Sequence, residues 1–558
     1  MSATARRLVP LALLLALAAC TKKPDPDSPL AFVPADTPYV MANLEPVAQP
    51  VLDQWTSMSR EVWPISLDMY RRMLDKAEPQ DSVQIKAARA VLEEVSANLA
   101  ANTPEKLGFK GSTHAAVYGI GLLPVLRLQL ADPDALRATI ARVEAKSGAK
   151  LPVATLGGQD YWSLTVEKAQ LLFAVSGRQL VLSVAPAAIS DELRKQLLGI
   201  TRPAKTLDPE VLVALNKRHG YTPQGSGYVD IARLMDFYTN EADPVRRELA
   251  QALPGDALQK VDPVCKTELG QIASRFPRIS LGYTELDTKR MTLHAQLDMD
   301  AALAKDFTAA WTAAPGTGAK AEGLLDFSLS LPVLKQKAFW LKQAKAVTDQ
   351  PYACPDLADL NDAFANLKKS LDTTIPPPAS DLTGLRVSLS KLEFKNDKEA
   401  PDYAGKLLVA LTNPAGAVAM GQLALAPLKD LKLMPDGKPV ALPADLAPAQ
   451  LPPMFAAMNN SALALSAGAG EEAGLGAYLE APAANKVVFL RTYFSGSLYA
   501  QFGSMMEKFA LFLPEEQRAD MDSQKKLFDL YQKWIDHAEF SLTATDQGLV
   551  FVEVIQTR

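Results

Sequence analysis

The chain has few residues of the types that build catalytic and metal sites. Its 558 residues include only four histidines and three cysteines, and aromatic residues make up 7%. His114, His219, His294 and His537 are at least 75 residues apart, so no two can be metal ligands on one turn of helix. The chain also has no G-x-S-x-G turn, calcium loop or correctly spaced nucleotide-binding glycine loop. The sequence therefore predicts no catalytic residue, no metal and no cofactor.

Long apolar runs are also missing after the first twenty residues. No later run reaches the eighteen or more apolar residues that a membrane-spanning helix needs, although 48% of all residues are hydrophobic. This composition can bury large cores, and the length predicts two to four domains. The formal net charge of −5 opposes binding to nucleic acid.

The first twenty residues combine a charged start with a short apolar segment. Arg6 and Arg7 precede a ten-residue apolar run, residues 8–17, which is typical of a secretory signal peptide. The run ends in Leu17-Ala18-Ala19-Cys20, which resembles a bacterial lipobox. This resemblance implies a signal peptide at residues 1–19, cleavage before Cys20, and a diacylglyceryl group and an acyl chain such as palmitate on Cys20.

The residues after Cys20 predict where the anchored protein lies. Thr21 stands where retention at the inner membrane calls for Asp, so the resemblance implies the outer membrane, with the body facing the periplasm. Residues 20–29 are polar and rich in proline, which predicts a flexible tether. The alternative is cleavage at the A-x-A string Ala16-Leu17-Ala18, which would leave Cys20 as a thiol.

The two remaining cysteines predict a disulfide. The periplasm oxidises thiols, and lipidation of Cys20 leaves Cys265 and Cys354 as the only candidates. Each stands at the start of the last predicted helix before a pair of strands. Two free buried thiols are the alternative.

The same order of elements recurs four times and predicts an α+β fold. Each copy has a short strand, helical sequence and then two strands, so we expect strand-helix-helix-hairpin modules with mostly antiparallel sheets packed by helices. The predicted opening strands are residues 38–44, 227–230, 323–328 and 461–465. Residues 30–298 form an N-terminal α+β region of two modules, and residues 299–558 form a C-terminal region of two more.

Two connectors interrupt this order. Residues 132–198 are an insert with a helix at 133–147, strands at 161–166 and within 171–184, and a helix capped by Ser190. Residues 413–453 are rich in proline, and Met434–Pro439 predicts a hairpin turn between short strands.

A family resemblance can be drawn from the start of the folded region. Residues 32–39 (FVPADTPY), followed by residues 43–46 (NLEP), resemble the opening of an uncharacterised family of bacterial envelope lipoproteins with a domain of unknown function. Residues 161–186 and 227–230 fit the same pattern, so the resemblance covers about the first half of the chain. It implies fold and location but no activity and no catalytic residue.

Two helical stretches are rich in methionine and aromatic residues. They could fill a core or line an adaptable apolar groove or partner face. The first contains Trp55, Met58, Trp63, Met69, Tyr70 and Met73, and the second contains Met505, Met506, Phe509 and Phe512 among others.

Three hypotheses about function remain. The first is a lipid-anchored envelope protein with a non-enzymatic interaction or assembly role and envelope protein partners. The second is a carrier or sensor of an apolar ligand, and the third is a hydrolase. A carrier predicts a continuous apolar cavity, an enzyme predicts polar side chains clustered in a cleft, and an assembly factor predicts a broad exposed patch.

Overall fold

The structure is a computed structural model of the 558-residue chain. It describes residues 25, 27–76, 82–109, 113–253, 258, 261–394, 402–446, 452–510 and 514–558, without the side chains of 508–510 and 515–517. The predicted signal peptide, Cys20 and most of the predicted tether lie outside the described residues.

The described residues form fifteen α-helices and one sheet of nineteen strands, in which every pair is antiparallel. The predicted α+β class with antiparallel strands is therefore confirmed. From one edge of the sheet to the other the strands follow in this order: β4 (Val153–Leu156), β5 (Gln159–Val166), β6 (Ala169–Ser176), β7 (Gln179–Pro186), β3 (Leu123–Gln129), β2 (Ala115–Ile120), β1 (Tyr39–Ala42), β8 (Ser226–Asp230), β9 (Arg278–Leu286), β10 (Arg290–Asp298), β19 (Gly548–Thr557), β18 (Ile535–Thr545), β17 (Val487–Ser495), β11 (Leu325–Ser330), β12 (Leu382–Glu393), β13 (Asp402–Leu411), β16 (Ala462–Ala467), β15 (Met454–Met458) and β14 (Val440–Ala441).

Twelve of these strands belong to four repeat units, each with an opening strand, helices and a hairpin. The units are β1-β2-β3, β8-β9-β10, β11-β12-β13 and β17-β18-β19. Their helices, in chain order, are α2 (Gln49–Lys76) and α3 (Val83–Ala101); α7 (Ile231–Thr239), α8 (Pro244–Ala252) and α9 (Pro263–Arg275); α11 (Val333–Asp349) and α12 (Ala358–Leu371); α15 (Gly496–Ala510) and α16 (Glu515–Trp534). Opening strands join units one and two (β1 with β8) and units three and four (β11 with β17), while β10 and β19 join the two pairs.

The opening strand of the fourth copy was wrongly predicted. All but the first of residues 461–465 fall in β16, which pairs with β13 and β15, whereas the fourth unit opens with β17. A short apolar strand has the same sequence pattern in either place, and only its pairing partner decides its role.

Two inserts extend the sheet at its two edges. The first contains α4 (Pro133–Ser147), β4 to β7, α5 (Asp191–Leu198) and α6 (Pro209–His219), and the second contains α13 (Pro414–Ala424), β14 to β16 and α14 (Leu475–Leu479). Helix α10 (Ala301–Ala309) leads from β10 toward β11. Strand β4 and helix α13 were not predicted. The predicted hairpin at Met434–Pro439 is wrong, because β14 follows this turn but none of the described strands directly precedes it.

The end signals of helix α4 show how local sequence sets these elements. The carboxylate of Asp132 accepts hydrogen bonds from the backbone N–H groups of Asp134 and Ala135, and Pro133 occupies the first turn. Gly148 ends the helix with a φ of 67°, a conformation that costs glycine little. The observed bounds therefore match the predicted helix at 133–147.

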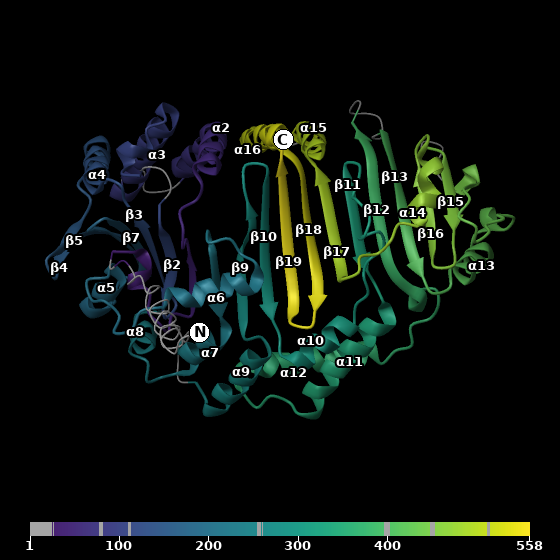
Figure 1. Ribbon diagram of the computed structural model, residues 1–558, viewed down its shortest axis with the longest axis horizontal. Helices are drawn as coiled ribbons and strands as arrows, with labels where there is room; N and C mark the ends of the chain where they lie inside the picture. The colour runs from purple at the N-terminus through teal and green to yellow at the C-terminus, as the bar shows by residue number, and fades with distance from the viewer. Residues whose placement is uncertain are drawn as a thin grey trace, which may run out of the picture.

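The two faces of the sheet are covered differently. Helices α5, α6 and α14 pack on one face, which we call the covered face, and its strand residues Val40, Val125, Leu172 and Val181 are at most 2% exposed. Figure 1 shows α4, α3, α2, α16 and α15 in a series along the upper ends of the strands. The main core therefore lies on the covered face.

The covered face also buries charged groups. The guanidinium of Arg386 donates to both carboxylate oxygens of Asp326, at 3.2 and 2.6 Å. Arg491 lies 3.8 Å from the same carboxylate and donates to the carbonyl oxygens of Gly316, Thr317 and Ala319. These contacts compensate buried charge and fix the loop before β11 against the sheet.

Candidate functional site

The face opposite the covered face carries one continuous row of apolar residues. Residues paired across antiparallel strands point to the same side of a sheet, so the pairing register shows which side chains share a face. One register row crosses eighteen strands from β4 to β15, and apart from a glycine all its members are apolar. This apolar row consists of Val153, Trp162, Phe173, Leu182, Leu126, Val117, Met41, Gly227, Leu281, Ala295, Phe551, Leu542, Leu490, Leu329, Leu385, Val409, Leu463 and Met458.

Most of the apolar row remains accessible to solvent. Met458 is the only one of its apolar side chains that is fully buried, while Val153, Val117 and Met41 are 55%, 38% and 37% exposed. We call the face that carries this row the apolar face. At a strand spacing of about 4.8 Å, the row extends for about 80 Å. An accessible apolar surface of this extent is unusual for a monomeric soluble protein, and we therefore take this face as the candidate binding surface.

A second register row widens the apolar face by two residues along the central strands. It is mostly apolar, but Glu553 and Thr492 interrupt it. Its other members, from β9 to β16, are Tyr283, Leu293, Phe540, Phe327, Val387, Leu407 and Leu465.

Helices lie over one end of the apolar face and leave cavities beneath them. A cavity of about 320 Å³ lies between α2, α16 and the ends of β10, β18 and β19, and Met58, Trp63, Met291, Trp534 and Ile555 are among its lining residues. A second cavity, of about 430 Å³, lies between α3 and strands β5 to β7. A third, of about 210 Å³, lies between α3 and α4 over Phe173 of the apolar row.

Ion pairs hold α2 against α16. Lys533 of α16 lies 2.6 Å from Glu61 of α2, and Arg72 of α2 lies 3.2 Å from Asp520 of α16. Because α16 also packs on α15, and α2 on α3, the first and fourth units together form one helical layer. This layer runs from α4 to α15 along the upper ends of the strands (Figure 1).

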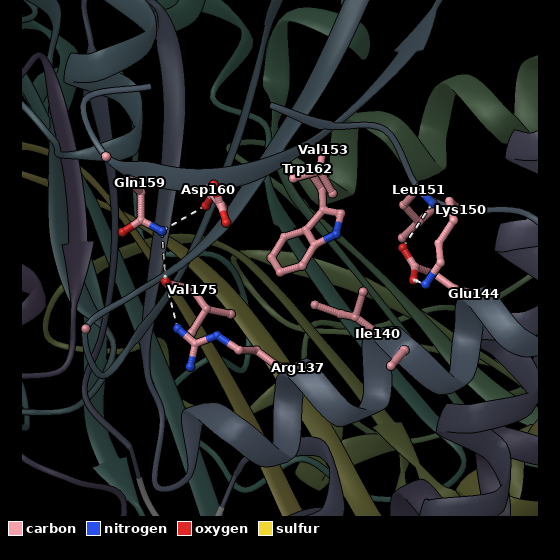
Figure 2. Close-up of a pocket in the computed structure, with 13 residues that line it drawn as sticks. Arg137, Ile140, Glu144, Lys150, Leu151, Val153, Gln159, Asp160, Trp162 and Val175 are labelled. Atoms are coloured by element: carbon pink, nitrogen blue, oxygen red, sulfur yellow. Dashed lines mark hydrogen bonds and ion pairs between the residues drawn. The ribbon is translucent and has the colours of Figure 1, made fainter. Parts of the chain in front are cut away.

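The apolar face ends at a larger cavity with charged residues. This cavity of about 770 Å³ lies between α4 and strands β4 to β6, and Val153 and Trp162 of the apolar row line it. Figure 2 shows Arg137, Gln159 and Asp160 at one end, Glu144 and Lys150 at the other, and Trp162 and Ile140 between them. The ring of Trp162 stacks on Phe173 at a centroid distance of 5.1 Å, which links this cavity to the one under α3 and α4.

The methionine-rich stretches fall on the helical layer. Met58 and Trp63 of α2 line the cavity against α16, so this part of the predicted groove faces the apolar face. Met505 and Met506 of α15 are half-buried. Phe509 lies in α15, but its side chain is outside the description, and Phe512 lies outside the described residues.

The structure contains the disulfide that the sequence predicted. The sulfur of Cys265 in α9 is bonded to that of Cys354, which precedes α12, and the bond joins the second and third repeat units. Asp356 lies close by, but the two sulfurs are bonded to each other and are not available as thiolate ligands.

One cluster of side chains on the covered face was not predicted. His219 at the end of α6 and His294 of β10 have ring centroids 6.1 Å apart, and the hydroxyl of Tyr221 lies 3.0 Å from Nδ1 of His294. The two histidines are 75 residues apart in the sequence, and the pairing of β8, β9 and β10 brings them together. The sequence alone does not show this pairing.

Burial shifts the pKa values of both histidines. The pKa of His219 is lowered by burial and by Arg218, although Asp298 opposes this shift. The pKa of His294 is lowered by burial, by His219 and by Lys486. Both rings therefore favour the neutral form, which lets Nδ1 of His294 accept a hydrogen bond from Tyr221. His114 directly precedes β2, and His537 lies on β18.

No family model, curated protein or solved structure matches this chain. The resemblance of residues 32–46 to envelope lipoproteins therefore stays a prediction. Among the residues that the structure describes, no helix is long and apolar enough to cross a membrane.

Proposed function

We propose that this protein is a lipid-anchored envelope protein that binds the acyl chains of membrane lipids along its apolar face. This makes it a carrier or sensor of an apolar ligand, attached through Cys20 and facing the periplasm, with no catalytic role. The observation that carries the proposal is the apolar row, whose apolar side chains, apart from that of Met458, stay at least partly accessible to solvent.

The shape and chemistry of the apolar face favour acyl chains over a small polar substrate. Acyl chains are flexible and apolar, and each buried methylene contributes about 0.8 kcal/mol. The half-exposed side chains of Phe551, Leu542 and Leu293 offer a continuous surface for such chains. Methionines such as Met58 and Met291 beside them suit ligands of varying shape.

An interaction or assembly role is the second candidate, because an accessible apolar face also suits a protein partner. The cavities beneath α2, α3 and α4 favour the lipid, since chains can enter spaces that a folded partner cannot fill. The two candidates differ in what stays bound to the purified protein.

Analysis of bound lipid tests the proposal. Full-length protein is purified from envelopes in mild detergent, and co-purifying lipids are extracted and quantified by mass spectrometry. We expect wild-type protein to retain diacyl lipids and Val117→Asp to retain several-fold less, because a carboxylate on the apolar face opposes acyl chains. Val117 is 38% exposed, so this change should leave the folded state intact, which the melting temperature checks.

The matched control is Leu423→Asp, which introduces the same charge at a residue that is 90% exposed on α13. It should retain lipid like the wild type. Wild-type protein free of lipid, or equal retention by Val117→Asp, would contradict the proposal. A protein partner captured without lipid, and lost in Val117→Asp, would favour the assembly role instead.

A further inference from the structure

We propose that the charged cavity between α4 and strands β4 to β6 binds the head group of a zwitterionic phospholipid whose acyl chains lie on the apolar face. This inference rests on the proposed function and adds the class of lipid. In this arrangement the phosphate lies at Arg137 and the ammonium group at Asp160.

The cavity adjoins the apolar face directly. Val153 and Trp162 are the first two members of the apolar row and also line the cavity. Ile140 and Leu151 are shared with the apolar cavity under α3 and α4. A lipid with its head group here therefore meets apolar side chains as soon as its acyl chains leave the cavity.

Opposite charges at one end of the cavity match a zwitterion. In Figure 2 the side chains of Arg137 and Asp160 lie at the same end, with Gln159 beside them. The side chain of Arg137 is 48% exposed and pairs at 2.9 Å with Asp134, a 90% exposed partner that a phosphate can replace. An arginine fork binds phosphate oxygens well, because several N–H donors point the same way.

The acidic groups disfavour a purely anionic head group. The carboxylate of Asp160 accepts a hydrogen bond from the hydroxyl of Thr155, and the carboxylate of Glu144, which pairs with Lys150 at 2.7 Å, lies at the far end. Lys150 already neutralises Glu144, so an anionic head group at Arg137 would meet the carboxylate of Asp160 without an ammonium group to neutralise it. An ammonium group near Asp160 instead gains a charge-assisted contact.

Three lipids with identical acyl chains but different head groups distinguish binding of the head group from binding of the chains. Full-length protein, stripped of lipid in detergent, is titrated with mixed micelles that contain phosphatidylethanolamine, phosphatidylglycerol or diacylglycerol with pyrene-labelled chains. We expect wild-type protein to bind phosphatidylethanolamine about tenfold more tightly than the other two, since charge-assisted contacts are only partly screened here.

Two substitutions assign the charges. Arg137→Gln should remove the advantage of phosphatidylethanolamine over diacylglycerol, and Asp160→Asn should remove its advantage over phosphatidylglycerol. The matched control is Arg178→Gln, at the exposed turn between β6 and β7 and outside the cavity, which should change none of the three affinities.

The outcomes distinguish this inference from the proposed function. Equal binding of all three lipids by the wild type, or unchanged preferences in Arg137→Gln and Asp160→Asn, would overturn the head-group site and leave acyl-chain binding in place. If none of the three lipids binds, both proposals fail.

Discussion

At the scale of single residues, the histidine pair links stability to pH. His219 and His294 lie close together on the covered face, and burial lowers both pKa values. A lowered pKa means that the unfolded chain takes up protons near pH 6.5, where the folded protein does not. Stability is therefore greatest above that pH and falls as the pH drops below it.

We expect the melting temperature of the wild type to fall between pH 7 and pH 5 by more than that of the double variant His219→Asn/His294→Gln. The variant removes the two groups whose protonation favours unfolding. Thermal unfolding followed by circular dichroism measures the difference. His114→Gln, which changes a histidine outside this pair, should keep the wild-type pH dependence. Parallel pH curves for wild type and double variant would show that the pair does not couple to folding.

The sequence predicted contacts between neighbouring residues but not contacts between residues far apart in the chain. Ser190 was correctly predicted as a helix cap, because a cap bonds to backbone only a few residues away. The partnership of His219 with His294, and of Asp326 with Arg386 and Arg491, depends on which strands lie beside each other. The cavity around Arg137 was missed for the same reason, since its residues come from α4 and three strands.

At the scale of elements, periodicity and turn residues predicted most helices and hairpins, but the order of strands in the sheet stayed hidden. The alternation of apolar residues predicts a strand but does not predict which strand pairs with it. For this reason β16 was mistaken for an opening strand, although it pairs with β13 at the edge of the third unit. Alternation also does not reveal that residues 290–295 of β10 and 549–556 of β19 are half-buried on both faces of the sheet.

The disulfide is the covalent link between two such elements. Cys265 and Cys354 are 89 residues apart and are about 1% exposed. In the chain-entropy model, closing a loop of this length stabilises the folded state by on the order of 4 to 5 kcal/mol, which is an upper figure.

We expect Cys265→Ser to lower the free energy of unfolding by about 2 to 4 kcal/mol, because the unfolded chain regains its freedom. Chemical denaturation of oxidised wild type and variant measures this change. Reduced wild-type protein is the matched control and should be destabilised to a similar extent. Equal midpoints for oxidised wild type and Cys265→Ser would mean that the bond contributes little, and two alkylated thiols in freshly isolated, denatured protein would mean that it is absent in the cell.

At the scale of the whole molecule, the start of the chain bears on how the sheet is placed at a membrane. Asp27 accepts a hydrogen bond from the side chain of Gln179, whose register neighbours on β3 and β7 include Arg127 and Val181 of the covered face. Asp27 lies seven positions after Cys20, and an extended chain of that length spans about 25 Å at most. An acylated Cys20 would therefore hold this end of the sheet within about 25 Å of the membrane.

Acylation of Cys20 is the prediction on which this placement depends. Metabolic labelling with a palmitate analogue should mark wild-type protein and leave Cys20→Ala unlabelled, because that thiol is the proposed attachment point. Cys354→Ser is the matched control: it removes another cysteine and should keep both the label and the membrane fraction. Two acyl chains hold a protein on a bilayer firmly, so Cys20→Ala should move from the membrane to the soluble fraction. Label that persists in Cys20→Ala would contradict the anchor and would favour cleavage after Ala18, which leaves the apolar face to find its lipids from solution.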